Sequence, residues 1–353
     1  MTAGASPAAL RREAYAFLAA AGLTAPGIAP LAGDASARRY FRVADRGRSL
    51  VLMDAPRPAN ESMAYFVAVT QWLRARGLSA PEVLASDFDE GFVLLEDLGD
   101  ALFARVLSPD DARSDVEALY GAAVDLLATL PVGAAPEGTG PYDRDVLLRE
   151  ARLATDWWAA GTGAPLSPDA LAEYEALLGD ALAPALVAPA QGVATLRDYH
   201  AENLIWLPER PGLARVGLLD YQDALIGHPA YDLVSLLEDA RRDTDEPLRN
   251  AMLARYLAAR GVSGDGAEAF RAAYAALGAQ RNLKIVGIFA RLCLRDGKPR
   301  YLDLIPRVWT HLQRDLSAPG LAALRDFVAA NIPIPDAERR ERLATRAGQG
   351  IAA

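Results

Sequence analysis

The alternation of apolar and polar residues changes its period along the chain, and this change divides the sequence near residue 99. In the first part, short apolar stretches with a period of two are bounded by turn residues, which is typical of strands. These stretches lie at residues 38–43, 49–53, 82–86 and 92–95. Asp-Arg-Gly separates the first two stretches and Asp-Glu-Gly the last two, and a helical pattern at residues 60–76 lies between the pairs. Residues 1–99 are therefore predicted to form a small antiparallel sheet with one inserted helix.

The second part, residues 100–353, has mostly the period of amphipathic helices. Ser-Pro-Asp at residues 108 and 167 supplies an N-cap and a first-turn proline, which are helix-start signals. Helices are expected near residues 109–130, 145–160 and 168–185 and from 229 to about 330, with short strands at 193–197, 204–207 and 215–219. The tail from residue 339, rich in charged and then small residues, is expected to be frayed. The predicted fold class is α+β, with a β-rich lobe at residues 1–99 and a larger, mainly helical lobe at 100–353.

Charge and composition narrow the possible partners. The net charge of −9 disfavours a general nucleic-acid binder, because a phosphate backbone requires a basic surface. Cys293 is the one cysteine, so an intrachain disulfide is excluded. No signal peptide and no apolar run of bilayer-spanning length stand out, which predicts a soluble, cytoplasmic protein without a membrane partner. The oligomeric state stays open.

The candidate chemistry lies where the short strands flank a polar cluster. Asp198 is followed five residues later by Asn203, and Asp220 ends the next strand but one. A carboxylate such as Asp198 can orient an alcohol and accept its proton, and the oxygens of Asn203 and Asp220 suit a hard cation. Each residue alone is more often a turn or cap residue. Their order behind a β-rich lobe predicts a phosphoryl-transfer site at which all three side chains meet in one cleft.

The segment Leu196–Asn203 resembles the catalytic loop of the aminoglycoside phosphotransferase and choline kinase superfamily, which is distantly related to protein kinases. Further segments carry the resemblance, which covers about residues 28–300: Leu94–Gly99, similar to the hinge; Leu218–Ala224, similar to the metal loop; and Tyr231–Leu233. Gly33–Arg42, Val51–Pro56 and Leu218–Ala224 are similar to the branch that phosphorylates N-acetylmuramate and N-acetylglucosamine at the C1 hydroxyl in cell-wall recycling.

The resemblance implies a two-lobed, protein-kinase-like fold and ATP and Mg²⁺ as cofactors. It implies that Asp198 is the catalytic base and that Asn203 and Asp220 are the metal ligands, with Asp232 in a structural role. The backbone of the hinge, at Glu96 and Leu98, is expected to bind adenine.

Two positions depart from the superfamily pattern. Leu196 stands where most members have a histidine, and Met53 stands where most have a phosphate-binding lysine. No lysine precedes Lys284, so the strand lysine is absent rather than displaced. The phosphates are then expected to contact the backbone around Ser36 and the side chain of Arg38 or Arg39. Strand alternation places these arginines on opposite faces, so one of them is expected to reach the phosphate, and which one stays open.

The acceptor site is expected beside Asp198 in the helical lobe. A tryptophan can stack on a sugar ring, a carboxylate can bind its hydroxyls, and an arginine can bind the carboxylate of N-acetylmuramate. The candidates are Glu150, Trp157, Trp158, Tyr199, His200, Asp223 and Arg281. For the tryptophans and Arg281, helix packing or a place on the helix surface is an equally good interpretation.

Two other functions stay open. An aminoglycoside or another small-molecule hydroxyl could be the acceptor within the same fold. The departures at Met53 and Leu196 are also compatible with a non-catalytic, nucleotide-binding scaffold.

Overall fold

The computed structural model describes residues 10–31, 38–56, 63–107 and 113–351. The chain separates into two compact units, and each unit is built from several separate stretches of the sequence. Unit 1 comprises residues 1–108, 136–138 and 202–224, and unit 2 comprises residues 109–135, 139–201 and 225–353. The predicted boundary at residue 99 falls near the end of the first segment of unit 1, and a division of the fold at that residue stays a prediction.

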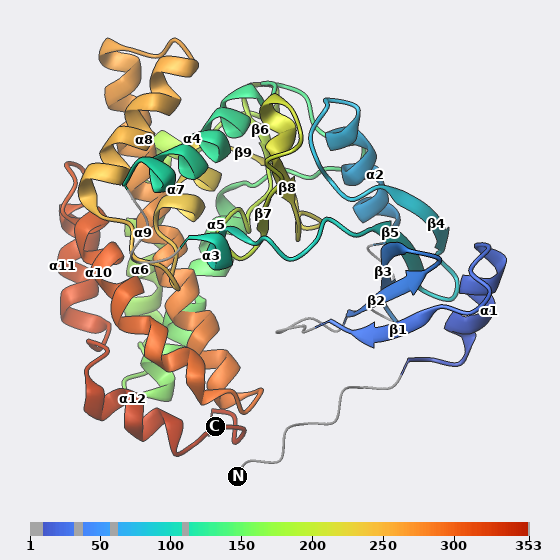
Figure 1. The fold of residues 1–353 in the computed structure, drawn as a ribbon. Coiled ribbons are helices and arrows are strands. Elements are labelled where there is room, and N and C mark those ends of the chain that lie inside the picture. Colours follow the sequence, from blue (N-terminus) through green and yellow to red (C-terminus); the bar gives the residue numbers. More distant parts are fainter. Residues whose placement is uncertain (1–9, 32–37, 57–62, 108–112, 352–353) are drawn as a thin grey trace. The chain divides into compact units, whose positions relative to one another are not determined.

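Unit 1 contains a five-stranded antiparallel sheet in the order β1-β2-β3-β5-β4 (Figure 1). The strands are β1 Gly27–Pro30, β2 Arg39–Asp45, β3 Arg48–Asp54, β4 Val83–Asp87 and β5 Phe92–Glu96. Both predicted hairpins are confirmed, because β2 pairs with β3 and β4 pairs with β5. The sequence pattern did not predict β1, which pairs with β2 at the sheet edge.

Helices complete the sheet of unit 1. Helix α1 (Glu13–Ala20) buries Ala14 and Leu18 against one sheet face. That face is apolar because alternate residues of three strands point to it, namely Phe41, Val43, Leu50, Leu52, Phe92 and Leu94. Helix α2 (Met63–Arg74) is the predicted insertion between β3 and β4, and a short helix α3 (Phe103–Val106) follows the sheet.

A second element of unit 1 comes from much later in the sequence. β7 (Leu204–Trp206) and β8 (Val216–Leu218) form an antiparallel pair, with a 3₁₀ turn at Gly212–Arg215 between them. The Trp206 N–H donates to the Ala101 carbonyl at 2.7 Å, and the Leu218 N–H donates to the Ser79 carbonyl at 2.9 Å. Leu98, Ile205 and Leu207 form an apolar cluster under these contacts. The β7–β8 pair is thereby fixed to the segments that flank the sheet.

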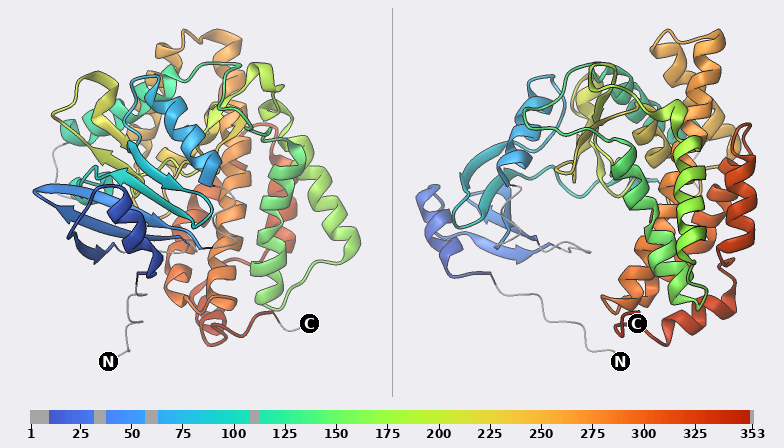
Figure 2. Two further views of the ribbon diagram at one scale, coloured as in Figure 1. Left: turned by 90° about the vertical axis from the view of Figure 1, so that its right-hand side faces the viewer. Right: turned by 180° about the vertical axis from the view of Figure 1, so that it is seen from behind.

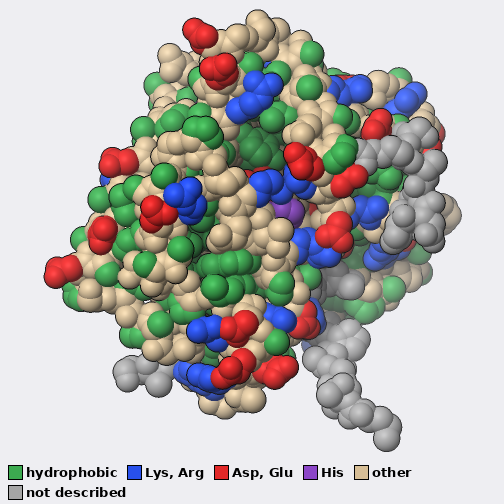
Figure 3. Space-filling view, turned by 90° about the vertical axis from the view of Figure 1, so that its left-hand side faces the viewer, with side chains coloured by type: hydrophobic (Ala, Val, Ile, Leu, Met, Phe, Trp, Pro, Cys, Tyr) green, Lys and Arg blue, Asp and Glu red, His purple; other side chains and the backbone are tan. Residues whose placement is uncertain are grey.

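Unit 2 is mainly helical, with one two-stranded sheet of β6 (Val193–Thr195) and β9 (Leu225–Gly227). Its α-helices are α4 Arg113–Thr129, α5 Arg144–Ala151, α6 Pro168–Ala181, α7 Ala230–Leu237, α8 Glu246–Ala259, α9 Gly264–Leu294, α10 Ile305–Leu316, α11 Ala322–Asn331 and α12 Ala337–Ala344. Figure 2 shows α9 running the length of the helical bundle, and it packs against α5, α7, α10 and α12. Acidic and basic side chains are interspersed on the helical surface in Figure 3, in keeping with ion pairs such as Arg307 with Asp243 at 2.6 Å.

Two expectations for unit 2 are corrected. The predicted helix at 145–160 is divided, because α5 ends at Ala151 and a π-helical turn spans Ala154–Ala159. The prediction of a frayed tail is wrong as far as residue 351, because helix α12 forms there and two later N–H groups cap the end of α9. The Gly348 N–H donates to the Cys293 carbonyl at 3.0 Å, and the Gly350 N–H donates to the Leu294 carbonyl at 2.8 Å. None of the helices in the described ranges is long and apolar enough to cross a membrane.

Candidate functional site

The predicted site residues are shared between the two units. Unit 2 contains Asp198 together with Glu150, Trp157, Trp158, Tyr199, His200 and Arg281. Unit 1 contains Asn203 and Asp220 together with Arg38, Arg39, Glu96, Leu98 and Asp223. Ser36 lies outside the described residues. The structure thus brings together the two predicted metal ligands, and the meeting of Asp198 with them in one cleft stays a prediction.

Asn203 and Asp220 lie at the open end of the β7–β8 pair. The Leu219 N–H donates to the Asn203 carbonyl at 2.9 Å, so the residue before β7 and the residue after β8 are neighbours. Asp220 is exposed and has a φ of +57°, a left-handed conformation that aspartate tolerates better than most residues. The Gln222 side-chain amide donates to Asp220 Oδ1 at 2.7 Å and orients the carboxylate. An amide oxygen and an accessible carboxylate fit the oxygen preference of Mg²⁺.

The loop before Asp198 is held through its backbone by α7. The Asp232 carboxylate accepts hydrogen bonds from the Leu196 N–H at 2.6 Å and from the Arg197 N–H at 2.8 Å. The Ser235 hydroxyl donates to the Arg197 carbonyl at 3.2 Å. Arg197 has a φ of +70°, which is uncommon for a residue with a side chain and is typical of functional loops. Burial raises the pKa of Asp232 to about 7, against the effect of the two N–H donors.

The side chain of Arg197 enters a buried polar cluster. Glu150 of α5 accepts hydrogen bonds from Arg197 and from the Tyr142 hydroxyl, and it pairs with Lys284 of α9 at 3.0 Å. Lys284 also donates to the Tyr231 hydroxyl at 3.3 Å. Burial opposes ionisation of Glu150, but Lys284 and Arg197 hold the pKa of the Glu150 carboxyl below its ordinary value. Burial likewise opposes the charge of Lys284, and Tyr231 and Glu150 nevertheless raise the pKa of the Lys284 ammonium above its ordinary value.

The other acceptor candidates of unit 2 differ in burial. Trp158 is fully buried and its indole N–H donates to the Pro333 carbonyl at 2.7 Å, whereas Trp157 of the same π-helical turn is half-buried. The Tyr199 hydroxyl donates to the Ala123 carbonyl in the interior at 2.8 Å. Arg281 is buried and donates to the Ser235 hydroxyl at 2.8 Å. His200 lies two residues after Asp198, and burial lowers the pKa of its imidazole. Contact of these residues with an acceptor stays a prediction.

The two strand arginines of unit 1 have different partners. Arg39 pairs with the fully buried carboxylate of Asp54, which Arg11 also binds at 2.7 Å. Arg38 instead forms a hydrogen bond with Tyr40. Burial raises the pKa of Tyr40 to about 12; Arg38 opposes this shift and Asp220 adds to it. Arg38 therefore shares the neighbour Tyr40 with Asp220, one of the two candidate metal ligands.

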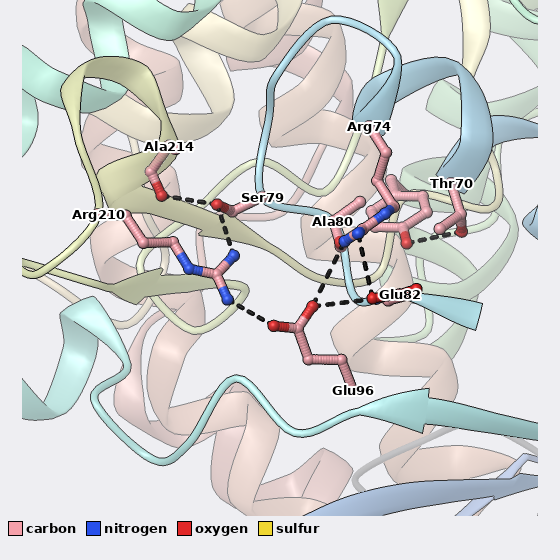
Figure 4. Close-up of polar contacts among 9 residues, drawn as sticks. Thr70, Arg74, Ser79, Ala80, Glu82, Glu96, Arg210 and Ala214 are labelled. Carbon is pink, nitrogen blue, oxygen red and sulfur yellow. Dashed lines mark hydrogen bonds and ion pairs between the residues drawn. The ribbon is translucent and has the colours of Figure 1, made fainter. Parts of the chain in front are cut away.

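The predicted hinge is held by ion pairs at Glu96 and at Asp97, and Figure 4 shows those of Glu96. The Glu96 carboxylate accepts hydrogen bonds from Arg210 at 2.5 Å and Arg74 at 3.4 Å. Arg210 also donates to the Ser79 hydroxyl at 2.8 Å (Figure 4). On the next residue, Asp97 accepts two hydrogen bonds from Arg42, at 2.7 and 3.2 Å. These contacts hold the side chains of the hinge in place. Binding of adenine by the hinge backbone stays a prediction.

From the sequence, Lys284 was identified only as the first lysine of the chain, and no partner was predicted for it. Its link to Glu150 joins helices that lie far apart in the sequence, and no local pattern indicates it. The sequence offered one signal that Lys284 belongs to the polar side of α9. Lys284 follows Arg281 by one helical turn, so both residues lie on one face of the helix.

Comparison with known proteins identifies relatives of the chain as a whole. Residues 27–274 match the model of the phosphotransferase enzyme family (APH). The chain is 42% identical to the N-acetylmuramate/N-acetylglucosamine kinase of Caulobacter vibrioides, over 90% of this chain and 96% of the relative. It is 38% identical to the protein of the same name from Pseudomonas aeruginosa, over 85% and 87% of the two chains. A choline/ethanolamine kinase family protein from Mesorhizobium loti has a similar fold, with a TM-score of 0.58 at 18% identity over 89% of this chain and 98% of the other.

Proposed function

Given that this chain belongs to the phosphotransferase enzyme family, we propose that it transfers the γ-phosphate of ATP to the C1 hydroxyl of N-acetylmuramate, N-acetylglucosamine or both. Membership confirms the resemblance and the fold class predicted from the sequence. The chain is accordingly an ATP-dependent kinase of a small-molecule hydroxyl. The choice of sugar, the C1 position and a cytoplasmic role in cell-wall recycling are the proposed parts.

The observation that carries the proposal is the near full-length similarity to kinases that are named for both sugars. Identity is 42% for the Caulobacter protein, which is aligned over 96% of its length. The solved choline/ethanolamine kinase relative is 18% identical and supports the fold alone.

Each candidate residue then has a role that its surroundings support. Asp198 follows a loop whose backbone is held by α7, and it would orient the sugar hydroxyl and accept its proton. Asn203 and Asp220 offer oxygens at the end of the β7–β8 pair and would hold Mg²⁺, which when bound supplies positive charge to the phosphate oxygens. Arg38, near Asp220 within unit 1, would take the phosphate contact of the absent strand lysine.

A panel of acceptors tests the proposal. Purified protein with ATP and Mg²⁺ is supplied with N-acetylmuramate, N-acetylglucosamine, kanamycin or no acceptor, and ADP release and ³¹P NMR of the product are measured. We expect ADP release that depends on an amino sugar and a phosphorus signal coupled to the anomeric proton. The methyl 1-glycoside of N-acetylglucosamine is the matched control, since its C1 oxygen has no proton to transfer.

The other outcomes separate the alternatives. Turnover with kanamycin and none with either amino sugar would identify an aminoglycoside kinase. Binding of ATP with no transfer to any acceptor would favour the scaffold.

A further inference from the structure

We propose that Glu150 and Lys284 are positioning residues that act on Asp198 through Arg197. With Tyr142 and Tyr231 these three residues form a cluster within unit 2, called the Glu150 clamp below. The expected effect on catalysis rests on the proposed function. The expected effect on the structure, a loop held in place at Asp198, does not.

The clamp converges on one carboxylate from three parts of the chain. Glu150 belongs to α5, Lys284 to α9, and Arg197 to the loop after β6. The side chains of Glu150 and Lys284 are each 13% exposed and that of Arg197 is 18% exposed, so solvent screens their attraction only weakly. One Glu150 oxygen binds Arg197, and the other binds Tyr142 and Lys284. Both oxygens of Glu150 therefore already have donors from within unit 2.

The geometry of Arg197 explains why such a clamp is needed. A left-handed conformation at a residue with a side chain is unfavourable and persists only where its surroundings enforce it. Asp232 and Ser235 hold the backbone of Arg197 from α7, and Glu150 holds its side chain from α5. Asp198 is the next residue, so the direction of its side chain depends on both anchors.

Charge gives Lys284 a separate part in the clamp. Without Lys284, the Glu150 carboxylate would form an ion pair with Arg197 alone. Lys284 adds a second positive charge beside Glu150 and keeps its carboxylate in place. Arg197 and Lys284 both attract the Asp198 carboxylate as well. Removal of Lys284 therefore weakens the hold on Glu150 and the hold on Asp198 at the same time.

The test uses the two lysines of the chain as a matched pair. Lys284→Met removes the charge inside the clamp, and Lys298→Met makes the same substitution at the residue just before a 3₁₀ helix at Pro299–Leu304, outside the clamp. Glu150→Gln and the Glu150→Gln/Lys284→Met double variant complete a double-mutant cycle. The first readout is hydrogen exchange at the Leu196 and Arg197 amides, which reports on the loop whether or not the protein phosphorylates a sugar.

We expect exchange at these two amides to be faster by about tenfold or more in Lys284→Met and Glu150→Gln, and unchanged in Lys298→Met. The kcat of both variants, calculated per protein molecule that is able to bind nucleotide, is expected to fall by about 10- to 100-fold with little change in KM for either substrate. Misplacement of a catalytic group affects the transition state more than it affects substrate binding. The double variant is expected to lose less than the product of the two single losses, because both substitutions act through Arg197. Lys284→Arg should recover part of kcat.

The contrary results are distinct. Unchanged exchange at Leu196 and Arg197 in Lys284→Met would overturn the clamp, even if the wild-type protein proved an excellent sugar kinase. A rise in KM for the sugar with kcat preserved would make Lys284 an acceptor-binding residue and would overturn the positioning role. A wild-type protein that phosphorylates no amino sugar would defeat the proposed function alone, and the exchange result would still decide the clamp.

Discussion

The two units fix their charged groups in different ways. In unit 1 the predicted hinge is held by a partly exposed pair, Arg210 with Glu96, whose side chains are 29% and 27% exposed, although Arg39 binds the fully buried carboxylate of Asp54. In unit 2 the loop of Asp198 is held by groups from the interior, with Asp232 2% exposed and the Glu150 side chain 13% exposed. Partly exposed pairs contribute little each and weaken with salt, whereas loss of one partner from a buried set leaves an uncompensated charge. The comparison indicates that substitutions in unit 2 should have the larger effects.

The largest expected effect is that of Asp198→Asn. Loss of the base is expected to lower kcat by about 10³-fold or more, because a positioned general base contributes roughly 10²- to 10⁴-fold. Binding of nucleotide with Mg²⁺ should persist, since the predicted ligands of both lie in unit 1. Steady-state kinetics and calorimetric titration with a non-hydrolysable ATP analogue measure the two properties. Asp220→Asn is the matched change in unit 1 and should instead weaken metal-dependent binding. Equal loss of nucleotide binding in both variants would contradict the division of roles.

Asp232→Asn is expected to change how stability depends on pH. The folded pKa of Asp232 is about 7 and its ordinary value is 3.8, so the folded protein holds this proton more tightly than the unfolded chain does. The contribution of Asp232 to stability is therefore greatest below pH 4 and declines as the pH rises to about 7. Over that range the free energy of unfolding of the variant, relative to wild type, is expected to rise by about 4 kcal/mol at most. Urea unfolding at several pH values measures the difference, and a difference independent of pH would show that the carboxyl is ionised throughout.

Packing around α9 gives the next largest effect. A Cβ atom on Gly287 would lie 2.1 Å from the carbonyl carbon of Leu153, in the backbone leading into the π-helical turn. Neither backbone can move freely, so Gly287→Ala is expected to destabilise the protein by about 3 kcal/mol. Gly266→Ala is the control in the same helix, where the nearest atom would be at 3.4 Å, and it should stabilise by about 0.5–1 kcal/mol. Thermal or urea unfolding of both variants measures the contrast. Equal destabilisation by the two changes would indicate that the π-helical turn yields easily.

The elements with strong local patterns were predictable from the sequence. The hairpins β2–β3 and β4–β5 and helix α2 follow alternation and turn signals, and the structure confirms them. Strand β1 (Gly27–Pro30) was missed because it is short, ends in proline and is mostly exposed, so it has no apolar alternation. The tail was wrongly expected to fray because its stability comes from the carbonyl groups of Cys293 and Leu294, which no pattern in the tail itself reveals.

The candidate site divides in the same way. Asp198, Asn203 and Asp220 are close in sequence, and their order with the intervening strands is the basis on which their chemistry is predicted. The partners that hold Asp198 come from α5, α7 and α9, and such contacts depend on how helices pack rather than on local sequence. The question of Arg38 or Arg39 also required the structure, because alternation separates the two side chains without saying which face meets Asp220.

The smallest expected effect tests the unit 1 side of the comparison. Arg210→Met removes the contacts to Glu96 and Ser79 and should lower the free energy of unfolding by about 1 kcal/mol or less, because the pair is partly exposed. Urea unfolding and exchange at the amides of Glu82 and Glu96 measure the loss. Arg48→Met is the control, because its pair with Asp45 is longer, at 3.7 Å, and should matter less still. Added salt should shrink the difference between Arg210→Met and wild type, since mobile ions screen this pair, and should leave the effect of Glu150→Gln in unit 2 nearly constant. If both effects respond equally to salt, the two units hold their charges alike and the contrast between them is wrong.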